Sequence, residues 1–199
     1  SWIEPMKYMG IWWGMHIGTE TWATGATHGA TTENARRYID FAASNGIRGL
    51  LVEGWNTGWE SWFQGSTFSF TKAYPDFDLR WLAKYARKHG VALIGHHVTG
   101  GNIPAYEEQM EDAFKLYEKL GIHAVKTGYA GDIIPKGQHH HGQWMINHYQ
   151  RVVECAAAHH IALDVHEPIK PTGLCRTWPN LLSGEGVRGT EYEAWSDGN

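Results

Sequence analysis

Residues 91–128 read VALIGHHVTGGNIPAYEEQMEDAFKLYEKLGIHAVKTG, and this stretch decides the fold. Its two ends, Val91–His96 and Ala124–Gly128, are short and mainly apolar, as strands covered on both faces are. Between them, Pro104 is suited to the first turn of a helix that runs to Leu120 and stops at Gly121. A strand, a helix and a second strand in this order predict a parallel βαβ unit.

The same alternation extends along the rest of the chain. Three more apolar runs predict strands, at residues 8–13, 47–53 and 161–165, and three more amphipathic segments predict helices, at 32–44, 79–88 and 143–159. This makes five strands, with no further clear strand after Val165. Because a closed barrel needs eight, we expect residues 1–199 to form the first five or so units, the N-terminal portion, of a (β/α)8 barrel (TIM barrel) rather than an open sheet.

Composition excludes several classes of protein. The chain has 199 residues and a net charge of −4 without a basic block, which argues against a nucleic-acid partner. Its apolar runs reach about half of the ~20 residues that a membrane-spanning helix needs. The two cysteines, Cys155 and Cys175, are too few for a disulfide scaffold, and we expect both to be buried free thiols without a role.

Polar residues gather where the predicted strands end. Glu53, His96, Lys126 and the pair His166-Glu167 each stand at or just beyond the carboxyl end of a different strand. In barrel enzymes this end of the strands carries the chemistry. One such residue is more often a loop former than a catalyst, but four strand ends out of five favour an active site.

Three glutamates follow the last predicted strand in a segment rich in Gly, Pro and Thr: Glu167, Glu185 and Glu191. Loop carboxylates are usually solvated one by one. Three of them could instead converge, which is costly unless a cation such as Ca²⁺ neutralises them. The same carboxylates could supply the acid and the base that glycoside hydrolysis needs.

Several motifs resemble glycoside hydrolase family 97, and in particular its inverting α-glucosidases. They cover essentially the whole chain: Lys7–Trp13, Leu51–Asn56, Val125–Tyr129, His139–Trp144, His166–Pro168 and Pro171–Asn180. The resemblance implies a catalytic (β/α)8 barrel flanked by an N-terminal β-sandwich and a C-terminal β domain, of which this chain is the first part of the barrel. It also implies an oligosaccharide substrate, no nucleic-acid or membrane partner, and a periplasmic or secreted location.

The resemblance implies a role for each polar residue by position. Glu191 is similar to the general acid, and Glu167 to a catalytic base that also binds Ca²⁺. Glu185 matches a further Ca²⁺ ligand, and Glu191 contacts the metal too, while a fourth ligand comes from the missing β-sandwich. The residues that match the sugar-binding positions are Glu53, His96, Lys126 and His166.

Two positions depart from the family pattern. Inverting members carry a second base glutamate where this chain has Val98, and retaining members carry a nucleophilic aspartate where it has Gly128. Glu167 is therefore the remaining base candidate. Because a positioned base contributes about 10²–10⁴-fold to the rate, an alternative is a catalytically weakened or non-catalytic sugar-binding barrel. We expect the 199-residue chain alone to be inactive.

The histidines leave a second alternative open, a zinc-dependent hydrolase of the amidohydrolase kind. Neither His96-His97 nor His139–His141 shows the i, i+4 spacing of a helical zinc motif, so we interpret the latter as loop structure near the site. We expect at least one of Trp55, Trp59 and Trp62 to line the sugar site. Two further groups are expected to be structural: Trp12, Trp13 and Trp81 in packing, and Glu107, Glu108, Glu111, Asp112, Glu118 and Lys119 on a solvated helix face.

Overall fold

The computed structural model describes residues 2–64, 68–194 and 196. Its centre is one sheet of six parallel strands that follow one another in sequence order. The strands are β1 (Tyr8–Ile11), β2 (Gly49–Val52), β3 (Ala92–Val98), β4 (Ala124–Gly128), β5 (Ala162–His166) and β6 (Leu181–Glu185). Sequential parallel strands joined by helices form a half-barrel, which confirms the predicted truncated (β/α)8 barrel.

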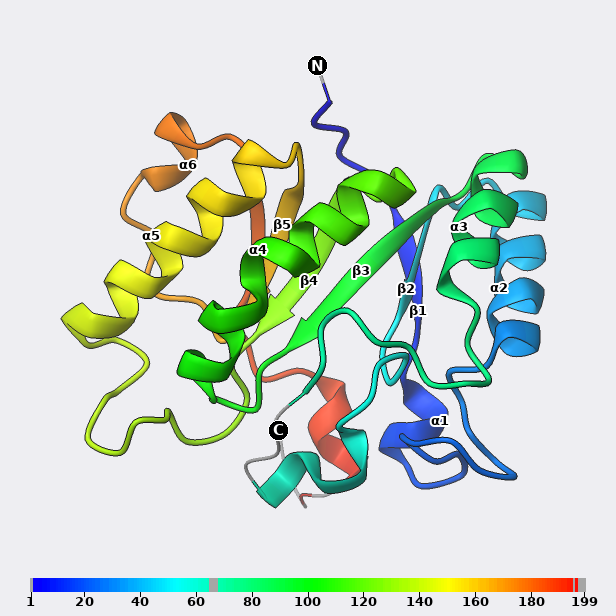
Figure 1. Cartoon of the computed structure of the whole chain (residues 1–199), viewed down its shortest axis with the longest axis horizontal. Helices are drawn as coiled ribbons and strands as arrows, with labels where there is room; N and C mark the ends of the chain where they lie inside the picture. The colour runs from blue at the N-terminus through cyan, green and yellow to red at the C-terminus, as the bar shows by residue number, and fades with distance from the viewer. Residues whose placement is uncertain (1, 65–67, 195, 197–199) are drawn as a thin grey trace.

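Helices cover the outer face of the sheet, with α2 to α5 packed along it in Figure 1. The helices are α1 (Trp13–His16), α2 (Thr32–Ser44), α3 (Leu79–Lys88), α4 (Ile103–Leu120), α5 (Gln143–Ala158) and α6 (Leu174–Thr177), with 3₁₀ helices η1 (Trp59–Gln64) and η2 (Thr190–Ala194). The Asp78 side chain caps α3 by accepting a hydrogen bond from the Trp81 N–H. Gly121 ends α4 in the left-handed conformation, with φ 70°.

The core lies between these helices and the sheet. Phe114 and Tyr117 of α4 and Met145 of α5 are all buried to within about 1% of complete burial. Each large apolar side chain removed from water in this way contributes roughly 1.5–3 kcal/mol. No helix in the described part of the chain is both long enough and apolar enough to cross a membrane.

The sheet is curled rather than flat. Tyr8 in β1 donates a hydrogen bond from its hydroxyl to Oδ2 of Asp164 in β5, at 2.7 Å, although three strands separate them in the sheet. Ser183 in β6 donates to the other oxygen of the same carboxylate. Side chains from both ends of the sheet therefore meet on its inner face, as expected of part of a cylinder.

Three sequence predictions about the fold are wrong. Residues 181–185 form β6, although Leu182 to Glu185 are exposed and include Ser183 and Gly184, so no buried apolar run marks the strand. The first strand ends at Ile11, because the chain turns into α1 at Trp13. Cys175 is exposed and Cys155 is partly exposed, so neither thiol is buried.

Two tryptophans expected in packing lie at the surface instead. Trp13 and Trp81 are 44% and 41% exposed. Trp81 stacks on Tyr85 one turn further along α3, with ring centroids 4.7 Å apart, and Trp13 stacks on His16. Trp12 is partly buried against the core, as expected.

Candidate active site

The register of the parallel strands aligns the candidate site residues in two rows across the sheet. At the carboxyl ends of β3 to β6, neighbouring strands align Val98, Gly128, His166 and Glu185; two residues earlier they align His96, Lys126, Asp164 and Ser183. Because side chains two residues apart share a face of a strand, both rows project from the same face of the sheet. The predicted polar residues thus converge, although His96 and Lys126 lie two residues inside their strands.

Lys126 joins two carboxylates from different strands. Its Nζ lies 3.5 Å from Oε1 of Glu53, just after β2, and 3.2 Å from Oε2 of Glu185. Burial works against the charge on the lysine, but Glu53 and Glu185 raise its pKa above the ordinary value. Burial raises the pKa of Glu53, and Lys126 opposes that rise. We conclude that the positive charge of Lys126 holds the carboxylates of Glu53 and Glu185 in place.

His96 is a buried, neutral imidazole. Burial, followed by the charges of His166 and Lys126, lowers its pKa well below the ordinary value. Its Nε2 lies 3.5 Å from Glu53, but neither ring nitrogen has a hydrogen-bond partner among the described residues. Buried polar atoms are normally hydrogen-bonded, so a buried ring with two unpartnered nitrogens is more typical of a functional site than of a packed core. The Nε2 of His166 is also buried and has no hydrogen-bond partner among the described residues.

Glu167 is held by its neighbours in one orientation. Its backbone has φ 50°, in the left-handed region that few non-glycine residues adopt, which is a form of strain found at functional sites. Its Oε2 accepts a hydrogen bond from the Tyr129 N–H at 3.0 Å and lies 2.7 Å from Nδ1 of His166. Burial favours the neutral acid, but these partners prevail and lower the pKa of Glu167, so the group is a carboxylate at neutral pH.

The backbone around Glu167 is anchored as well. The Tyr149 hydroxyl of α5 donates to the Glu167 carbonyl at 2.8 Å. His148, on the same helix, places Nε2 3.0 Å from the Tyr129 hydroxyl and Nδ1 2.6 Å from Glu107. Sequence reasoning placed Glu107 on a solvated face and did not identify the other three residues, because their importance depends on contacts between distant segments.

Gly128 is a position that admits no side chain. A Cβ built there would lie 1.6 Å from Nε2 of His166. A nucleophilic aspartate at this position is therefore incompatible with His166 as it is placed. The structure thus has no space for a side chain at the position where the resemblance implies the aspartate of retaining members.

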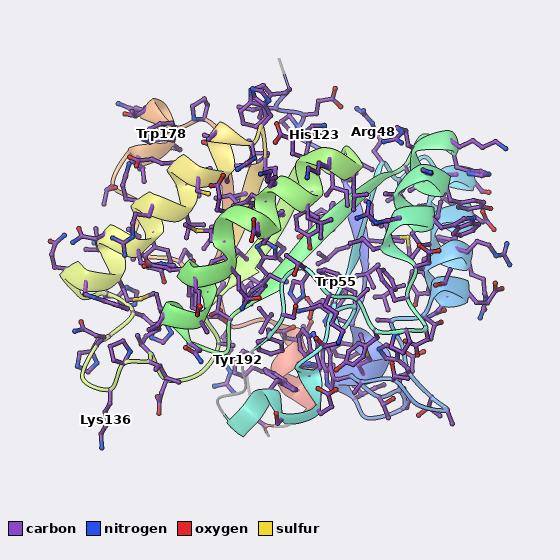
Figure 2. All side chains as sticks on the ribbon, viewed as in Figure 1. Arg48, Trp55, His123, Lys136, Trp178 and Tyr192 are labelled. Carbon is purple, nitrogen blue, oxygen red and sulfur yellow. The ribbon has the colours of Figure 1, made fainter. Side chains whose placement is uncertain are left out.

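A cleft of about 1140 Å³ is lined by Glu167, Glu185 and Glu191 together, whereas the predicted sugar-binding residues Glu53, His96, Lys126 and His166 are not among its lining residues. Lys136, Tyr192 and His139–His141 form more of its wall. Figure 2 shows Lys136 and Tyr192 at the lower end of the molecule, where the strands have their carboxyl ends. Glu191, in η2, also contributes to the electrostatic environment of Glu53 and of His16.

The three glutamates share the cleft without forming a tight cluster. Among the described residues, three metal-ligand atoms lie within 4.8 Å of one another at one place, elsewhere in the molecule, and these carboxylates do not reach that spacing. Glu185 contacts Lys126 and Glu167 contacts His166 instead. The donor set, all carboxylate oxygens around one cleft, fits Ca²⁺ in chemical kind.

The aromatic residues after β2 support the site more than they line it. Trp55 and Trp59 are 2% and 3% exposed, and Trp62 is partly exposed. Trp59 stacks on His96 with ring centroids 5.8 Å apart, and the Trp55 indole donates to the His96 carbonyl at 3.2 Å. In the described structure Trp62 is thus the member of this group with accessible surface for a sugar.

The adjacent histidines of β3 cannot bind one metal ion together. His97 lies on the opposite face of the strand from His96 and packs among Tyr106, Phe114 and Tyr117. In the loop after β4, Nε2 of His140 lies 2.8 Å from the Tyr129 carbonyl. This geometry disfavours the zinc-hydrolase alternative for His96-His97.

Comparison with known proteins gives a consistent result. The sequence profile of the family Glycoside hydrolase 97 matches residues 12–187. A retaining alpha-galactosidase of Bacteroides thetaiotaomicron is 30% identical over 98% of this chain and 26% of its own length. The chain spans about a quarter of the length of the curated relatives it matches.

Solved structures include closer relatives. A glycoside hydrolase family 97 enzyme from Pseudoalteromonas sp. strain K8, in complex with acarbose, is 53% identical, with a TM-score of 0.92 over 98% of this chain and 31% of its own. A variant of that enzyme, in complex with panose, matches equally well.

Proposed function

Because the chain belongs to glycoside hydrolase family 97, we propose that it is the N-terminal portion of the catalytic barrel of an enzyme that hydrolyses α-glucosidic bonds with inversion. In this proposal Glu191 is the general acid and Glu167 the general base. Residues 1–199 supply both groups, while the remaining strands and flanking domains come from the rest of the protein. We expect the 199-residue chain alone to be inactive, because a half-barrel leaves the sugar site open on one side.

The contact between Gly128 and His166 carries the choice of inversion over retention. A retaining enzyme needs a nucleophile, and the position that the family resemblance gives to it has no room for a side chain. Glu167, by contrast, is an ionised carboxylate whose direction is set by Tyr129 and by its own backbone. A fixed, ionised carboxylate can remove a proton from water, which is the role that the proposal gives to Glu167.

The reaction then requires two proton transfers. Glu191 donates a proton to the glycosidic oxygen as the bond from that oxygen to the anomeric carbon breaks. A water molecule attacks the anomeric carbon from the opposite face and gives its proton to Glu167. The two carboxyl groups exchange their protonation states, which solvent restores before the next cycle.

In this proposal, sugar recognition rests on four polar residues at or near the carboxyl ends of the strands. The unpartnered nitrogens of His96 and His166 can bond to hydroxyl groups, and Glu53 and Lys126 supply an acceptor and a donor beside them. The structural relative from Pseudoalteromonas binds acarbose and panose, both oligosaccharides, which supports an oligosaccharide substrate. Panose is an α-glucoside, so the 53% identity to this relative, against 30% to the galactosidase, favours an α-glucoside as the substrate.

We also propose that Glu167, Glu185 and Glu191 hold Ca²⁺, with a further ligand from the β-sandwich domain. When bound, the ion would neutralise the three carboxylates and fix their positions. The shared cleft and the carboxylate donors support this assignment. A periplasmic or secreted location, where Ca²⁺ is abundant, is part of the same proposal.

The stereochemistry of the product tests the mechanism. The full-length protein, incubated with an aryl α-glucoside and followed by proton NMR, should first release β-glucose, and it should act more slowly on the matched α-galactoside. Initial release of the α-anomer would contradict inversion, and preference for the galactoside would contradict the assigned specificity.

Val98 favours one second candidate, a weakened or non-catalytic sugar-binding barrel. This side chain is buried and lies beside Gly128 in the strand register, where the resemblance implies another base. A Val98→Glu variant that gains activity at least tenfold would support the second candidate. Good turnover of the native protein and no gain from the variant would support the enzyme.

A further inference from the structure

A cluster of metal-ligand side chains lies on the outer surface, between two helices that carry none of the catalytic residues. Glu111 and Glu118 are seven residues apart on α4, and Cys155 and His159 are four residues apart at the end of α5. Both spacings place the two side chains of a pair on one face of a helix. Figure 1 shows α4 and α5 as neighbours on the outer face of the sheet.

The side chains meet closely across the helix pair. Oε1 of Glu111 lies 3.0 Å from Nε2 of His159, and the Cys155 thiol lies 3.3 Å from Oε2 of Glu111. One ligand atom from each of the three residues lies within 4.8 Å of the other two. In the described part of the chain, no other three acidic, histidine or cysteine side chains come together in this way.

These separations are close to those around a tetrahedral zinc ion. Zinc binds nitrogen and oxygen at about 2.0–2.2 Å and sulfur at about 2.3 Å, which places neighbouring ligand atoms roughly 3.3–3.7 Å apart. The contact between Glu111 and His159 needs to widen by a few tenths of an ångström to admit the ion, whereas that between Cys155 and Glu111 is already at such a separation. We propose that Glu111, Cys155 and His159 form a zinc site that links α4 to α5.

Glu118 completes the arrangement from the other side of the imidazole. Its Oε2 lies 2.9 Å from Nδ1 of His159, while Nε2 points to Glu111. Zinc-binding histidines typically donate their second ring N–H to a carboxylate, which fixes the tautomer and the direction of the ring. Glu118 is thus placed to orient the ligand without binding the ion.

The donor types select zinc over calcium. Thiolate and imidazole suit Zn²⁺, whereas Ca²⁺ takes oxygen ligands. The ion can enter from solvent on the side of Glu111, whose side chain is 72% exposed. The side chain of His159 is only 11% exposed and forms the inner part of the site. The site makes no use of the cleft residues, so it is independent of the proposed hydrolytic function.

Metal titration of the full-length protein tests the site. The protein is freed of metals, supplied with excess Ca²⁺ to saturate any calcium site, and titrated with Zn²⁺ by calorimetry and with Co²⁺ by absorption. We expect calorimetry to show one zinc ion bound per chain while the calcium sites are saturated, and Co²⁺ to give a thiolate-to-cobalt charge-transfer band. Adding zinc should also raise the Tm. Glu118→Gln should keep the band and weaken binding about 10–100-fold.

Paired cysteine variants provide the control. Cys155→Ser should abolish the charge-transfer band and the zinc-dependent rise in Tm, whereas Cys175→Ser, which removes the other exposed thiol, should change neither. Glu111→Gln should weaken zinc binding at least tenfold without altering the fold. Equal zinc binding by the native protein and Cys155→Ser, or loss of the band in Cys175→Ser, would overturn the proposal.

Discussion

A methyl group on Gly128 would lie 1.6 Å from Nε2 of His166, far inside the contact distance of unbonded atoms. The last residue of β4, Gly128, must therefore lack a side chain for the His166 imidazole, at the end of β5, to occupy its observed position. The proposed inverting mechanism depends on this relationship, because a glycine at position 128 cannot supply a nucleophile.

Replacing Gly128 with alanine should destabilise the protein by about 1–3 kcal/mol, since the added carbon must displace His166. Denaturation in urea measures the loss. Gly25→Ala is the matched control, because the nearest atoms to its added carbon are 3.9 Å away. Adding His166→Ala to the Gly128→Ala variant should recover part of the lost stability. A double variant no more stable than Gly128→Ala alone would contradict the contact.

Lys126→Met should cost about 3–5 kcal/mol in the free energy of unfolding at pH 7, because it leaves the buried Glu53 without its cation. The deficit should shrink at lower pH, where Glu53 takes up a proton, since burial raises its pKa. Denaturation at two pH values, compared with the exposed Lys119→Met on α4, measures both effects. A deficit independent of pH would argue against the ion pair.

Glu191→Gln should lower hydrolysis of an alkyl α-glucoside by about 10²–10⁴-fold in the full-length protein, because the leaving oxygen loses its proton donor. The loss should be much smaller for a dinitrophenyl glucoside, whose leaving group needs no proton. Steady-state kinetics on both substrates decides the point. Equal losses would mean that Glu191 has another role.

Acid should destabilise the fold through His97. Burial lowers its pKa from 6.5 to about 3, so between these values the unfolded chain binds a proton that the folded chain does not. The stability contributed by the neutral ring is present above pH 6.5 and lost as the pH falls toward 3, at up to ~1.4 kcal/mol per pH unit. His97→Asn should give a shallower dependence of the unfolding free energy on pH, and an identical slope would contradict the assignment.

Removal of calcium should abolish hydrolysis by the full-length protein, since Glu167, Glu185 and Glu191 would repel one another without the ion. Dialysis against a chelator followed by activity measurement is the test. Added Ca²⁺ should restore the rate, whereas Zn²⁺ should not. Full activity in chelator would show that Lys126 and His166 suffice to hold these carboxylates.

The sequence allowed the four long helices, α2 to α5, and most of the sheet to be predicted because their signals are local. α3 has the predicted bounds, and Gly121 ends α4 where the pattern indicated. The short helices α1 and α6 were not predicted. β6 escaped prediction because it lies at the edge of the sheet and Leu182 to Glu185 are exposed, so burial left no mark on the residue types.

The site could be predicted only where position along a strand decides it. Glu53, His96, Lys126 and His166 converge because parallel strands bring their carboxyl ends together. The contacts that Trp59 makes with His96, and that Tyr149 makes with Glu167, depend on how loops and helices fold back. Side-chain spacing around the three glutamates depends on the same packing, which no periodic pattern encodes.

The bond between Tyr8 and Asp164 spans 156 residues, so the two partners emerge from the ribosome far apart in time. At about 5–20 residues per second, the first strand waits roughly 8–30 s for its hydrogen-bond acceptor to be synthesised. The hydrogen bond that links the first strand to the fifth therefore cannot form during translation until the fifth strand has been synthesised.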